Sequence, residues 1–544
     1  MNKADILIKS HYIFCNINHP LINGGVAISN NRIIYVGTDW KLFVDSDTQL
    51  LDYSDFLVIP GIHDSHTHFM LSAFYKSGLS ISLEGSKSEQ EAVDRLEKGV
   101  KETSEGEWII GNGWHHLLWV GGQLPSKHSL DEKYPRHPIL LTSFDGHKVW
   151  LNSCALEKLG IDEDVKDTES GHYGRDEFGN LTGILFESVG VIASATVQSQ
   201  ILDHRSKEWL LEFIKEANQY GITSVSEVSS MTGLFMPIGG DLIPDSLYQN
   251  LLDENQLNIR IHMYPPLLED LSRAIEMSKR YRGTLLQFSG VKHFVDGVID
   301  THTAYFLEPY NNPYYKNDRG ATILPEEKLE SLIFESIKHD FSVRLHTVGD
   351  GAVHMALNIF EKAQSFFGKR ENLRHCLEHL EVIGESDISR LKELNVVASY
   401  QPSHGTYDSE EIEADLGKDR FKLMWPFRTL IDEHVPLAFG TDVPVVSINP
   451  FEGIYHAVTR KSLKGCPKNG WQPQEKITVK EAIHAYTYGS AYAVGRENEL
   501  GTLEVGKLAD LTVLDTNILN CPHEKILSTK SLLTIVNGKI VYQV

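Results

Sequence analysis

The sequence predicts an α/β protein: a (β/α)8 TIM barrel, joined to a β-sandwich built from both chain ends and carrying an inserted subdomain. Three observations predict this fold. From about residue 58 to 494, apolar strand-like runs alternate with amphipathic helical runs. Short β-rich runs occur at both ends, and a stretch at 107–153, rich in Trp, His, Gly and Pro, interrupts the alternation. Strand–helix alternation over this length favours parallel strands closed into a barrel.

Residues 1–57 and 495–544 are expected to form one domain together. Their β-rich runs are 4–8, 25–29 and 32–36 near the start, and 510–514, 532–536 and 539–542 near the end. The pair Asn537-Gly538 separates the last two runs as a hairpin-type turn. Because neither end holds enough strands for a stable sheet of its own, we expect the two ends to pair into one composite β-sandwich.

The barrel is expected at 58–494. Its strand candidates are 56–59, 224–228, 260–264, 291–294, 342–345, 396–399 and 436–439, and its helical candidates include 205–220, 326–339 and 351–367. An open doubly wound sheet is the alternative, but no Gly-x-Gly-x-x-Gly turn follows an early strand. The stretch 107–153 is interpreted as a subdomain or long loops over one end of the barrel, with ordinary loop structure as its alternative.

The composition is that of an acidic globular protein of 544 residues. Its 51 Lys and Arg residues against 74 Asp and Glu give a net charge of −23, which repels nucleic-acid phosphates and anionic membranes. The sequence has no apolar run of about 18 residues and no signal-peptide core. Five scattered cysteines fit a reducing compartment. We expect a cytoplasmic protein with a small-molecule substrate, and a homodimer only because homodimers are common.

The most informative local motif is Pro60-Gly61-Ile62-His63-Asp64-Ser65-His66-Thr67-His68, which directly follows the strand candidate 56–59. Alternate side chains of an extended segment share a face, so His66 and His68 point the same way. Two imidazoles at the carboxyl end of a strand offer two metal ligands at the active-site end of a barrel. Among 25 histidines such a pair also arises by chance, so further ligands are needed to support a metal site.

Three further candidate ligands follow strand-like runs. His346 and His379 each end an apolar run, and Asp442 follows a third. The two histidines are 379 − 346 = 33 residues apart, about one βα unit, and Asp442 follows His379 by 442 − 379 = 63, about two units. If His346 lies on strand 5, His379 falls on strand 6 and Asp442 on strand 8. Each alone is more often structural, for example as a helix cap, but their spacing strengthens the metal hypothesis.

Lys292 lies inside the apolar strand candidate 291–294. A charged lysine there is costly unless it is paired. Reaction with CO2 would turn its amine into a carbamate, a carboxylate able to bridge two cations. An ion pair with a nearby acid such as Asp296 is the alternative.

Together these motifs resemble the amidohydrolase superfamily and, within it, amidohydrolase family 3, which includes N-substituted formamide deformylase-like proteins. The segments that carry the resemblance are 4–8, 31–37, 145–153, Lys292 with Asp296-Gly297, 346–350, Glu378-His379, 440–445 and 500–511. Two positions depart from the family pattern. His63 stands where the superfamily usually has an apolar residue, and Trp114-His115 replaces the usual Trp-Asp. We expect His63 to alter the surroundings of the metal site, and Trp114-His115 to alter the substrate specificity.

The resemblance implies a binuclear metal centre. Two divalent ions would be held by His66, His68 and Asp442 for one ion, His346 and His379 for the other, and a CO2-derived carbamate on Lys292 between them. A hydroxide shared by the ions would attack an amide-type carbonyl, and Asp442 would pass its proton to the leaving nitrogen. The implied activity is hydrolysis of a carbon–nitrogen bond other than a peptide bond. Imidazole and carboxylate ligands favour zinc, although Mn, Fe, Co and Ni also fit.

The substrate-binding residues that we expect are Trp114, His147, Glu308 and Tyr310, with Trp119 and Trp150 as further aromatic candidates. Asp145-Gly146 before His147 indicates a turn that presents the imidazole. Packing inside a core or loop is the alternative for each of these residues.

The sequence is also compatible with other functions. A mononuclear deaminase of the same superfamily needs a Glu near the strand-5 histidine, and the segment 346–350 lacks one. A non-catalytic amidohydrolase-like scaffold would have no use for a complete ligand set. A binuclear lactonase or phosphotriesterase differs only in the electrophile, and a panel of amides, lactones and phosphotriesters separates these from an amide hydrolase.

Overall fold

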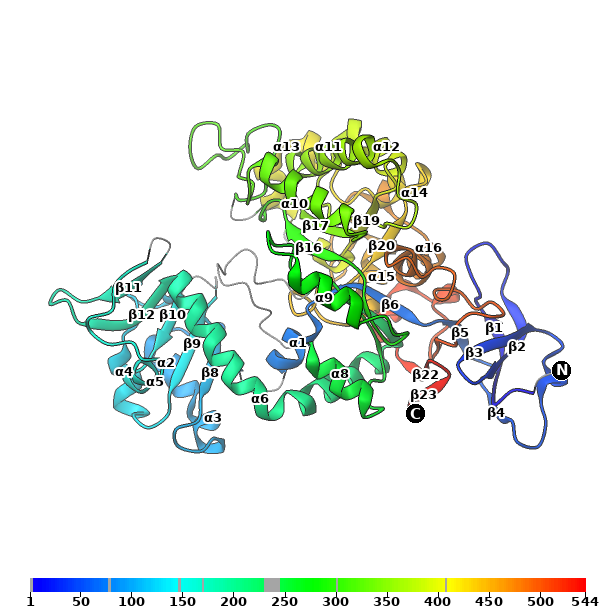
Figure 1. The fold of residues 1–544 in the computed structure, drawn as a ribbon, viewed down its shortest axis with the longest axis horizontal. Helices are drawn as coiled ribbons and strands as arrows, with labels where there is room; N and C mark the ends of the chain where they lie inside the picture. Colours follow the sequence, from blue (N-terminus) through cyan, green and yellow to red (C-terminus); the bar gives the residue numbers. More distant parts are fainter. Residues whose placement is uncertain are drawn as a thin grey trace. The chain divides into compact units, whose positions relative to one another are not determined.

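A computed structural model describes residues 3–76, 80–144, 148–168, 171–228, 245–299, 302–406 and 409–544 (Figure 1). The chain forms two units. The larger unit contains Met1–Phe69, Ile214–Ser230 and Tyr248–Val544, and the smaller unit contains Met70–Phe213 and Met231–Leu247. The smaller unit therefore consists of two insertions into the sequence of the larger one.

One eight-stranded sheet of the larger unit takes strands from both ends of the chain. Its order is β23-β22-β21-β5-β1-β2-β3, with β4 paired to β1. The strands are β1 (Ile6–Ile13), β2 (Ile22–Ser29), β3 (Arg32–Gly37), β4 (Gln49–Asp52), β5 (Leu57–Pro60), β21 (Leu511–Leu514), β22 (Ser531–Val536) and β23 (Lys539–Gln543). Antiparallel pairing of β21 with β5 joins the two ends, and Val26, Val58 and Val513 share one apolar core. The predicted domain boundaries at residues 57 and 494 stay predictions.

Two parallel sheets form the rest of the larger unit, and they confirm the α/β class. One has the order β15-β14-β13-β6 and the other β16-β17-β18-β19-β20. Their strands are β6 (Ile62–Thr67), β13 (Ile222–Glu227), β14 (Arg260–Met263), β15 (Leu286–Phe288), β16 (Val291–Phe294), β17 (Val343–Thr347), β18 (Cys376–His379), β19 (Val397–Tyr400) and β20 (Leu437–Phe439). Helices along this part of the chain are α8 (Ser246–Asp253), α9 (Ser272–Arg280), α10 (Glu326–Lys338), α11 (Asp350–Phe367), α12 (Glu385–Glu393), α13 (Ser409–Phe421), α14 (Phe427–Asp432), α15 (Pro450–Thr459), α16 (Val479–His484) and α17 (Ser490–Ala493).

Hydrogen bonds beyond the paired strands link the two parallel sheets. Past the end of β20, the Asp442 amide donates to the carbonyl of His66, 2.8 Å away, and the His68 amide donates to Val443, 2.9 Å away. On the other side, the Lys292 amide of β16 donates to the Pro265 carbonyl just past β14, 2.9 Å away. The carboxyl ends of these parallel strands therefore lie at one edge.

Burial on both faces explains the apolar sequences of these strands. In β17, Val343 and Leu345 alternate with Arg344 and His346, and all four are buried. Because successive side chains point to opposite faces, the apolar pair packs on one face and the polar pair lies on the other. Buried polar side chains on strands are the feature that builds a site here.

The smaller unit has its own sheet, with the order β11-β12-β10-β9-β8-β7. Its elements are α1 (Phe69–Lys76), β7 (Ser80–Ser82), α2 (Glu89–Arg95), α3 (Glu97–Glu102), β8 (Ile109–Trp114), α4 (Lys127–Lys133), β9 (Ile139–Ser143), β10 (Lys148–Leu151), α5 (Ser153–Lys158), β11 (Gly171–Arg175) and β12 (Leu181–Glu187), and α6 (Ser188–Gln219) leads back to the larger unit. The unit extends past 107–153 on both sides, because α2, β11 and β12 complete its sheet and core.

Three tryptophans form the centre of the smaller unit. Trp114, Trp119 and Trp150 are buried, and each indole N–H donates to a backbone carbonyl, at Leu141, Ser86 and Ser126 respectively, over 2.9–3.0 Å. These hydrogen bonds satisfy the only polar atom of each ring, which is how buried tryptophans are normally accommodated.

Among the described residues, no helix combines the length and the apolar character that crossing a membrane requires.

Candidate metal centre

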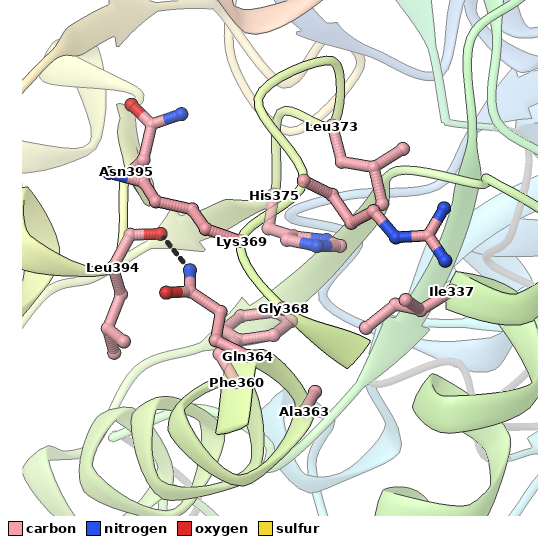
Figure 2. Close-up of a pocket in the computed structure, with 11 residues that line it drawn as sticks. Ile337, Phe360, Ala363, Gln364, Gly368, Lys369, Leu373, His375, Leu394 and Asn395 are labelled. Carbon is pink, nitrogen blue, oxygen red and sulfur yellow. Dashed lines mark hydrogen bonds between the residues drawn. The ribbon is translucent and has the colours of Figure 1, made fainter. Parts of the chain in front are cut away.

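The two ends of the parallel strands carry different side chains. At the amino ends of β18 and β19, a small pocket is lined by Phe360, Leu394 and Asn395, among others, and the Gln364 carboxamide donates to the Leu394 carbonyl over 2.7 Å (Figure 2). At the carboxyl ends, histidines and carboxylates converge instead. Ligand sites of parallel α/β sheets form at the carboxyl ends of the strands, so this end holds the candidate site.

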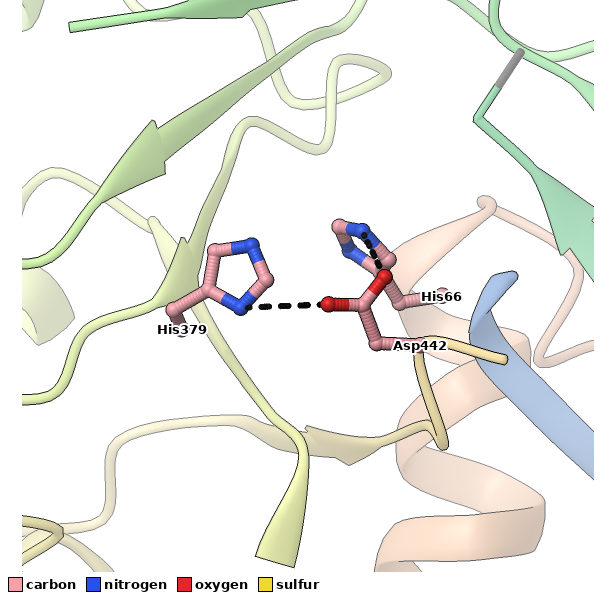
Figure 3. A group of neighbouring side chains, drawn as sticks. All are labelled: His66, His379 and Asp442. Carbon is pink, nitrogen blue, oxygen red and sulfur yellow. Dashed lines mark ion pairs between the residues drawn. The ribbon is translucent and has the colours of Figure 1, made fainter. Parts of the chain in front are cut away.

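Asp442 lies at the centre of the converging side chains. Its Oδ1 is 3.4 Å from Nε2 of His66 and 3.2 Å from Nε2 of His68, and its Oδ2 is 3.9 Å from Nδ1 of His379. Figure 3 shows the carboxylate between the rings of His66 and His379. Ligand atoms of His66, His379 and Asp442 all lie within 4.8 Å of one another, and all three residues are buried. The structure therefore brings His66 together with two side chains that lie more than 300 residues further along the chain.

His346 and Lys292 lie on neighbouring strands of the same sheet. The ring centroid of His346 is 4.5 Å from that of His379, and Lys292 pairs with Arg344 across β16 and β17. Lys292 is 2% exposed. Burial lowers the pKa of its amine to about 8, although the carboxylates of Glu378 and Asp442 act to raise it. The neutral amine, which is the form that reacts with CO2, is thus accessible near neutral pH.

The protonation of His66 tests whether these side chains fit a metal. Its Nδ1 is 2.6 Å from the Glu378 carboxylate, which only accepts, so Nδ1 carries the proton. Burial and the nearby Lys292 lower the pKa of His66 to about 4, so the ring is neutral. Its Nε2 lone pair therefore faces an oxygen of Asp442. Two lone pairs directed at one point match the arrangement of ligands around a cation.

His346 is also a neutral ring with one nitrogen lone pair, and a different hydrogen bond determines which nitrogen carries it. Its Nε2 lies 3.0 Å from the Gly297 carbonyl and donates to it, which leaves Nδ1 as the lone pair. Burial and Lys292 lower the pKa of this ring to about 3, and burial holds the pKa of His379 well below its ordinary value. Neutral imidazoles beside an ionised carboxylate are ligands that divalent metals such as zinc prefer. The donor set fits the metal.

The carboxylate of Asp442 is ionised, and its backbone is held in an unusual conformation. Burial acts to raise its pKa, but His66, His68 and His379 together hold the pKa well below the ordinary value. Asp442 has a φ of 64° and His379 a φ of 68°, the left-handed region that costs a non-glycine residue about 1–3 kcal/mol. Backbone strain at two residues whose side chains face each other is typical of functional sites.

Asp64 fixes the turn that carries Asp442. Its two oxygens accept from the backbone N–H and the hydroxyl of Thr441, over 2.8 and 2.6 Å. Burial raises the pKa of Asp64 to about 7. These hydrogen bonds set the position of the residue directly before Asp442, which explains how the strained backbone is maintained.

Sequence reasoning missed Glu378 and Arg344 as parts of the site. Glu378 is fully buried between the Nδ1 of His66 and the guanidinium of Arg344, whose Nη1 is 2.8 Å from Oε1. Burial opposes ionisation of Glu378, but Arg344, His66 and Lys292 lower its pKa to about 2. A carboxylate that holds the second nitrogen of a ligating imidazole is a common feature of metal sites. The sequence did contain a signal for this pair, because Arg344 and Glu378 are charged residues inside otherwise apolar strands.

His404 was also missed. It lies in the short 3-10 helix Pro402–Thr406 that follows β19, with its Nε2 3.6 Å from Oδ2 of Asp442. Its ring stacks on that of His379 with a centroid distance of 5.9 Å. The sequence did not single out His404, because it comes four residues after the end of β19 and not directly at the strand end.

The predicted substrate-binding residues lie in different surroundings. Tyr310 is buried, donates to the Ala304 carbonyl over 3.0 Å and stacks on His302. The Glu308 side chain is 79% exposed and 3.9 Å from Arg319. Within the described residues, neither makes a hydrogen bond or ion pair to the ligand side chains. Trp114 belongs to the core of the smaller unit, and His147 lies outside the described residues. The predicted substrate roles stay predictions.

His63 packs below the ligands and not among them. Its ring stacks on His262 with a centroid distance of 5.0 Å, and its Nε2 is 3.2 Å from the Ser226 hydroxyl. The departure from an apolar residue at this position is thus accommodated by a second buried imidazole.

Replacing Glu378 with Gln should weaken metal binding about 10–100-fold, the usual cost of losing the partner of a ligating histidine. The carboxamide can no longer act as a purely accepting, charged partner for Nδ1 of His66. Metal affinity is measured by competition with a chromophoric chelator. Glu475→Gln is the matched control, because Glu475 is a buried glutamate that accepts from Thr429 outside the site. Equal affinities of the two variants and the wild type would contradict the role of Glu378.

Comparison with known proteins gives consistent matches over almost the whole chain. A model of the amidohydrolase family matches residues 49–542. The protein LONG AFTER FAR-RED 3 of Arabidopsis thaliana is 30% identical over 550 residues, covering 99% of this chain and 92% of the relative. The N-substituted formamide deformylase of Arthrobacter pascens is 25% identical, covering 95% of this chain and 94% of the relative.

A solved structure has a similar fold. The crystal structure of an uncharacterized metal-dependent hydrolase from Pyrococcus horikoshii OT3 superposes with a TM-score of 0.76 at 24% identity. The match covers 95% of this chain and 99% of that chain.

Proposed function

Because this chain belongs to the amidohydrolase family, we propose that it is a metal-dependent hydrolase that cleaves an amide-type carbon–nitrogen bond in a small molecule. The observation that carries the proposal is the convergence of the buried imidazoles of His66, His68 and His379 on the carboxylate of Asp442. The deformylase activity for which the Arthrobacter pascens relative is named supports this bond type, and makes N-substituted formamides the first substrates to examine.

The proposed metal centre uses the side chains that the strand ends bring together. His66, His68 and Asp442 would hold one ion, His346 and His379 the other, and a carbamate on Lys292 would bridge them. Zinc is the metal that we propose, since imidazole and carboxylate suit it. When bound, such ions supply a water of lowered pKa, from about 15.7 toward about 7, and polarise a carbonyl as Lewis acids.

Asp442 is the proposed general base and acid. Its ionised carboxylate accepts the proton that the attacking water loses as the carbon–oxygen bond forms. It then returns this proton to the nitrogen as the carbon–nitrogen bond breaks, so that the products are a carboxylic acid and an amine. The hydrogen bonds from Thr441 to Asp64 keep the carboxylate in place during both transfers.

We also propose that the two parallel sheets close into one (β/α)8 barrel. Its eight strands would be β6, β13, β14 and β16 to β20. The hydrogen bonds from Asp442 to His66 and from Lys292 to Pro265 support closure on both sides. A cytoplasmic location and a homodimer stay predictions from the sequence.

Metal removal followed by a substrate panel tests the proposed function. The panel contains N-substituted formamides, other secondary amides, lactones and phosphotriesters. We expect amide hydrolysis that disappears after dialysis against a chelator and returns when Zn2+ is added, because the bound ions would lower the pKa of the attacking water. Faster turnover of lactones or phosphotriesters would replace the amide assignment, and full activity of the metal-free protein would contradict the metal-dependent mechanism.

A further inference from the structure

Gln401 carries a buried carboxamide to which the described residues offer no hydrogen bond. It directly follows β19 and is 1% exposed. Within the described part of the chain, neither its Oε1 nor its Nε2 has a hydrogen-bond partner. Leaving a buried polar atom unpaired costs about 1–3 kcal/mol, and native proteins rarely leave both ends of a carboxamide in this state. Such a group is able to bind a ligand that brings its own donor and acceptor.

The strand places this carboxamide on the face that carries the site. Tyr400 turns toward the helices, where its ring lies 5.0 Å from that of Phe427 in α14. Side chains alternate along a strand, so Ser399 and Gln401 project to the opposite face. Ser399 pairs across the sheet with Glu378, the partner of His66. Gln401 continues this face toward the carboxyl end, where the ligands lie.

The neighbours of Gln401 connect it to the metal ligands on both sides. The carbonyl of Tyr400 accepts from Gly440, two residues before Asp442, over 2.9 Å. The backbone carbonyl of Gln401 accepts from His404 over 2.9 Å, and the His404 ring contacts Asp442. The hydroxyl of Ser399, one layer deeper on the same face, also lacks a hydrogen-bond partner among the described residues. These polar atoms of Ser399 and Gln401 thus lie on the strand face that carries the candidate metal centre.

We propose that Gln401 recognises the substrate, with Oε1 accepting the N–H of the amide to be cleaved and Nε2 donating to a substrate oxygen. This inference rests on the proposed amide hydrolysis and names the substrate class more closely, as amides that keep an N–H. An ester or an N,N-dialkylated amide offers no hydrogen to Oε1, so the buried oxygen gains no hydrogen bond when either binds. A site built to hydrogen-bond a substrate group discriminates strongly against analogues that lack it.

Three matched compounds and one variant test the assignment: N-butylformamide, N-butyl-N-methylformamide and butyl formate, with the holoenzyme and Gln401→Met. We expect kcat/KM for N-butylformamide to fall roughly ten- to a hundredfold in the variant. Values for the other two compounds should fall at least about threefold less, since the variant costs them only the hydrogen bond from Nε2 and not the one to Oε1. Equal losses on all three compounds, or no loss on N-butylformamide, would overturn the assignment.

Measurements of stability and metal content show whether Gln401 recognises the substrate or only supports the structure. Removing an unpaired carboxamide should leave the melting temperature of Gln401→Met equal to or above that of the wild type, with an unchanged number of metals per chain. Gln364→Met is the matched control, because it removes a carboxamide that does hydrogen-bond, to Leu394 at the far end of the strands. The control should lower the melting temperature without changing substrate preference. A larger loss of stability in Gln401→Met than in the control would overturn the proposal.

The outcome also separates this proposal from the proposed function. If the wild-type holoenzyme hydrolyses none of the three compounds, the proposed reaction fails for this class. Binding of the same compounds is then measured by calorimetry. Tighter binding of N-butylformamide by the wild type than by Gln401→Met would still support recognition by Gln401, whereas equal binding or none would overturn it.

Discussion

Replacing Asp442 with Asn is expected to lower kcat roughly 10²–10⁴-fold, the usual contribution of general acid–base catalysis, while much of the metal stays bound. Asparagine keeps one oxygen that can face a cation. Its neutral carboxamide, however, cannot accept and return a proton as a carboxylate does. The imidazoles of His66 and His68 remain in place, since Glu378 and not Asp442 orients the first of them. Single-turnover rates and elemental analysis of the same samples measure the two quantities.

Asp387→Asn is the matched control for this variant. Asp387 is a buried carboxylate that also faces an imidazole, with Oδ2 3.0 Å from Nδ1 of His354, but it lies on α12 away from the ligands. The control should keep both kcat and metal content. Near-normal turnover of Asp442→Asn would remove the proton-transfer role from this residue, and a complete loss of metal would make it chiefly a ligand.

Replacing Lys292 with Ala should sharply reduce the number of metals per chain, from about two expected for a bridged site. A carbamate needs the lysine nitrogen, and alanine leaves the two ions without the bridging carboxylate. Burial already favours the neutral amine, because it lowers the pKa of Lys292 to about 8. Both proteins are expressed with bicarbonate and measured by elemental analysis, and native mass spectrometry shows whether the wild type carries the additional mass of one CO2.

A second buried lysine provides the control. Lys507 donates to the Glu497 carbonyl over 2.6 Å, so Lys507→Ala removes a buried amine without touching the site and should leave metal content unchanged. One ion in both the wild type and Lys292→Ala would favour a mononuclear centre. No ion in either, even after reconstitution, would favour a non-catalytic scaffold.

The sequence by itself determined the fold class and the positions of the candidate ligands. His66 and His68 are two residues apart in an extended segment, so they share a face whatever the rest of the fold does. His346, His379 and Asp442 follow apolar runs at spacings of one and two βα units, so parallel pairing brings them to one edge. These properties depend on local periodicity and on element length, and both can be read along the chain.

Only the tertiary structure decided how these side chains use their hydrogen bonds. The contact of His66 with Glu378 joins residues 312 positions apart, and it fixes which nitrogen of the ring faces Asp442. The same holds for the unpaired carboxamide of Gln401 and for the tryptophans that fill the core of the smaller unit. Strand register and the packing of distant segments set these contacts, and a pattern of residue types specifies neither. The candidate ligands can therefore be read from the sequence, whereas the orientation and the hydrogen bonds of their side chains are properties of the fold.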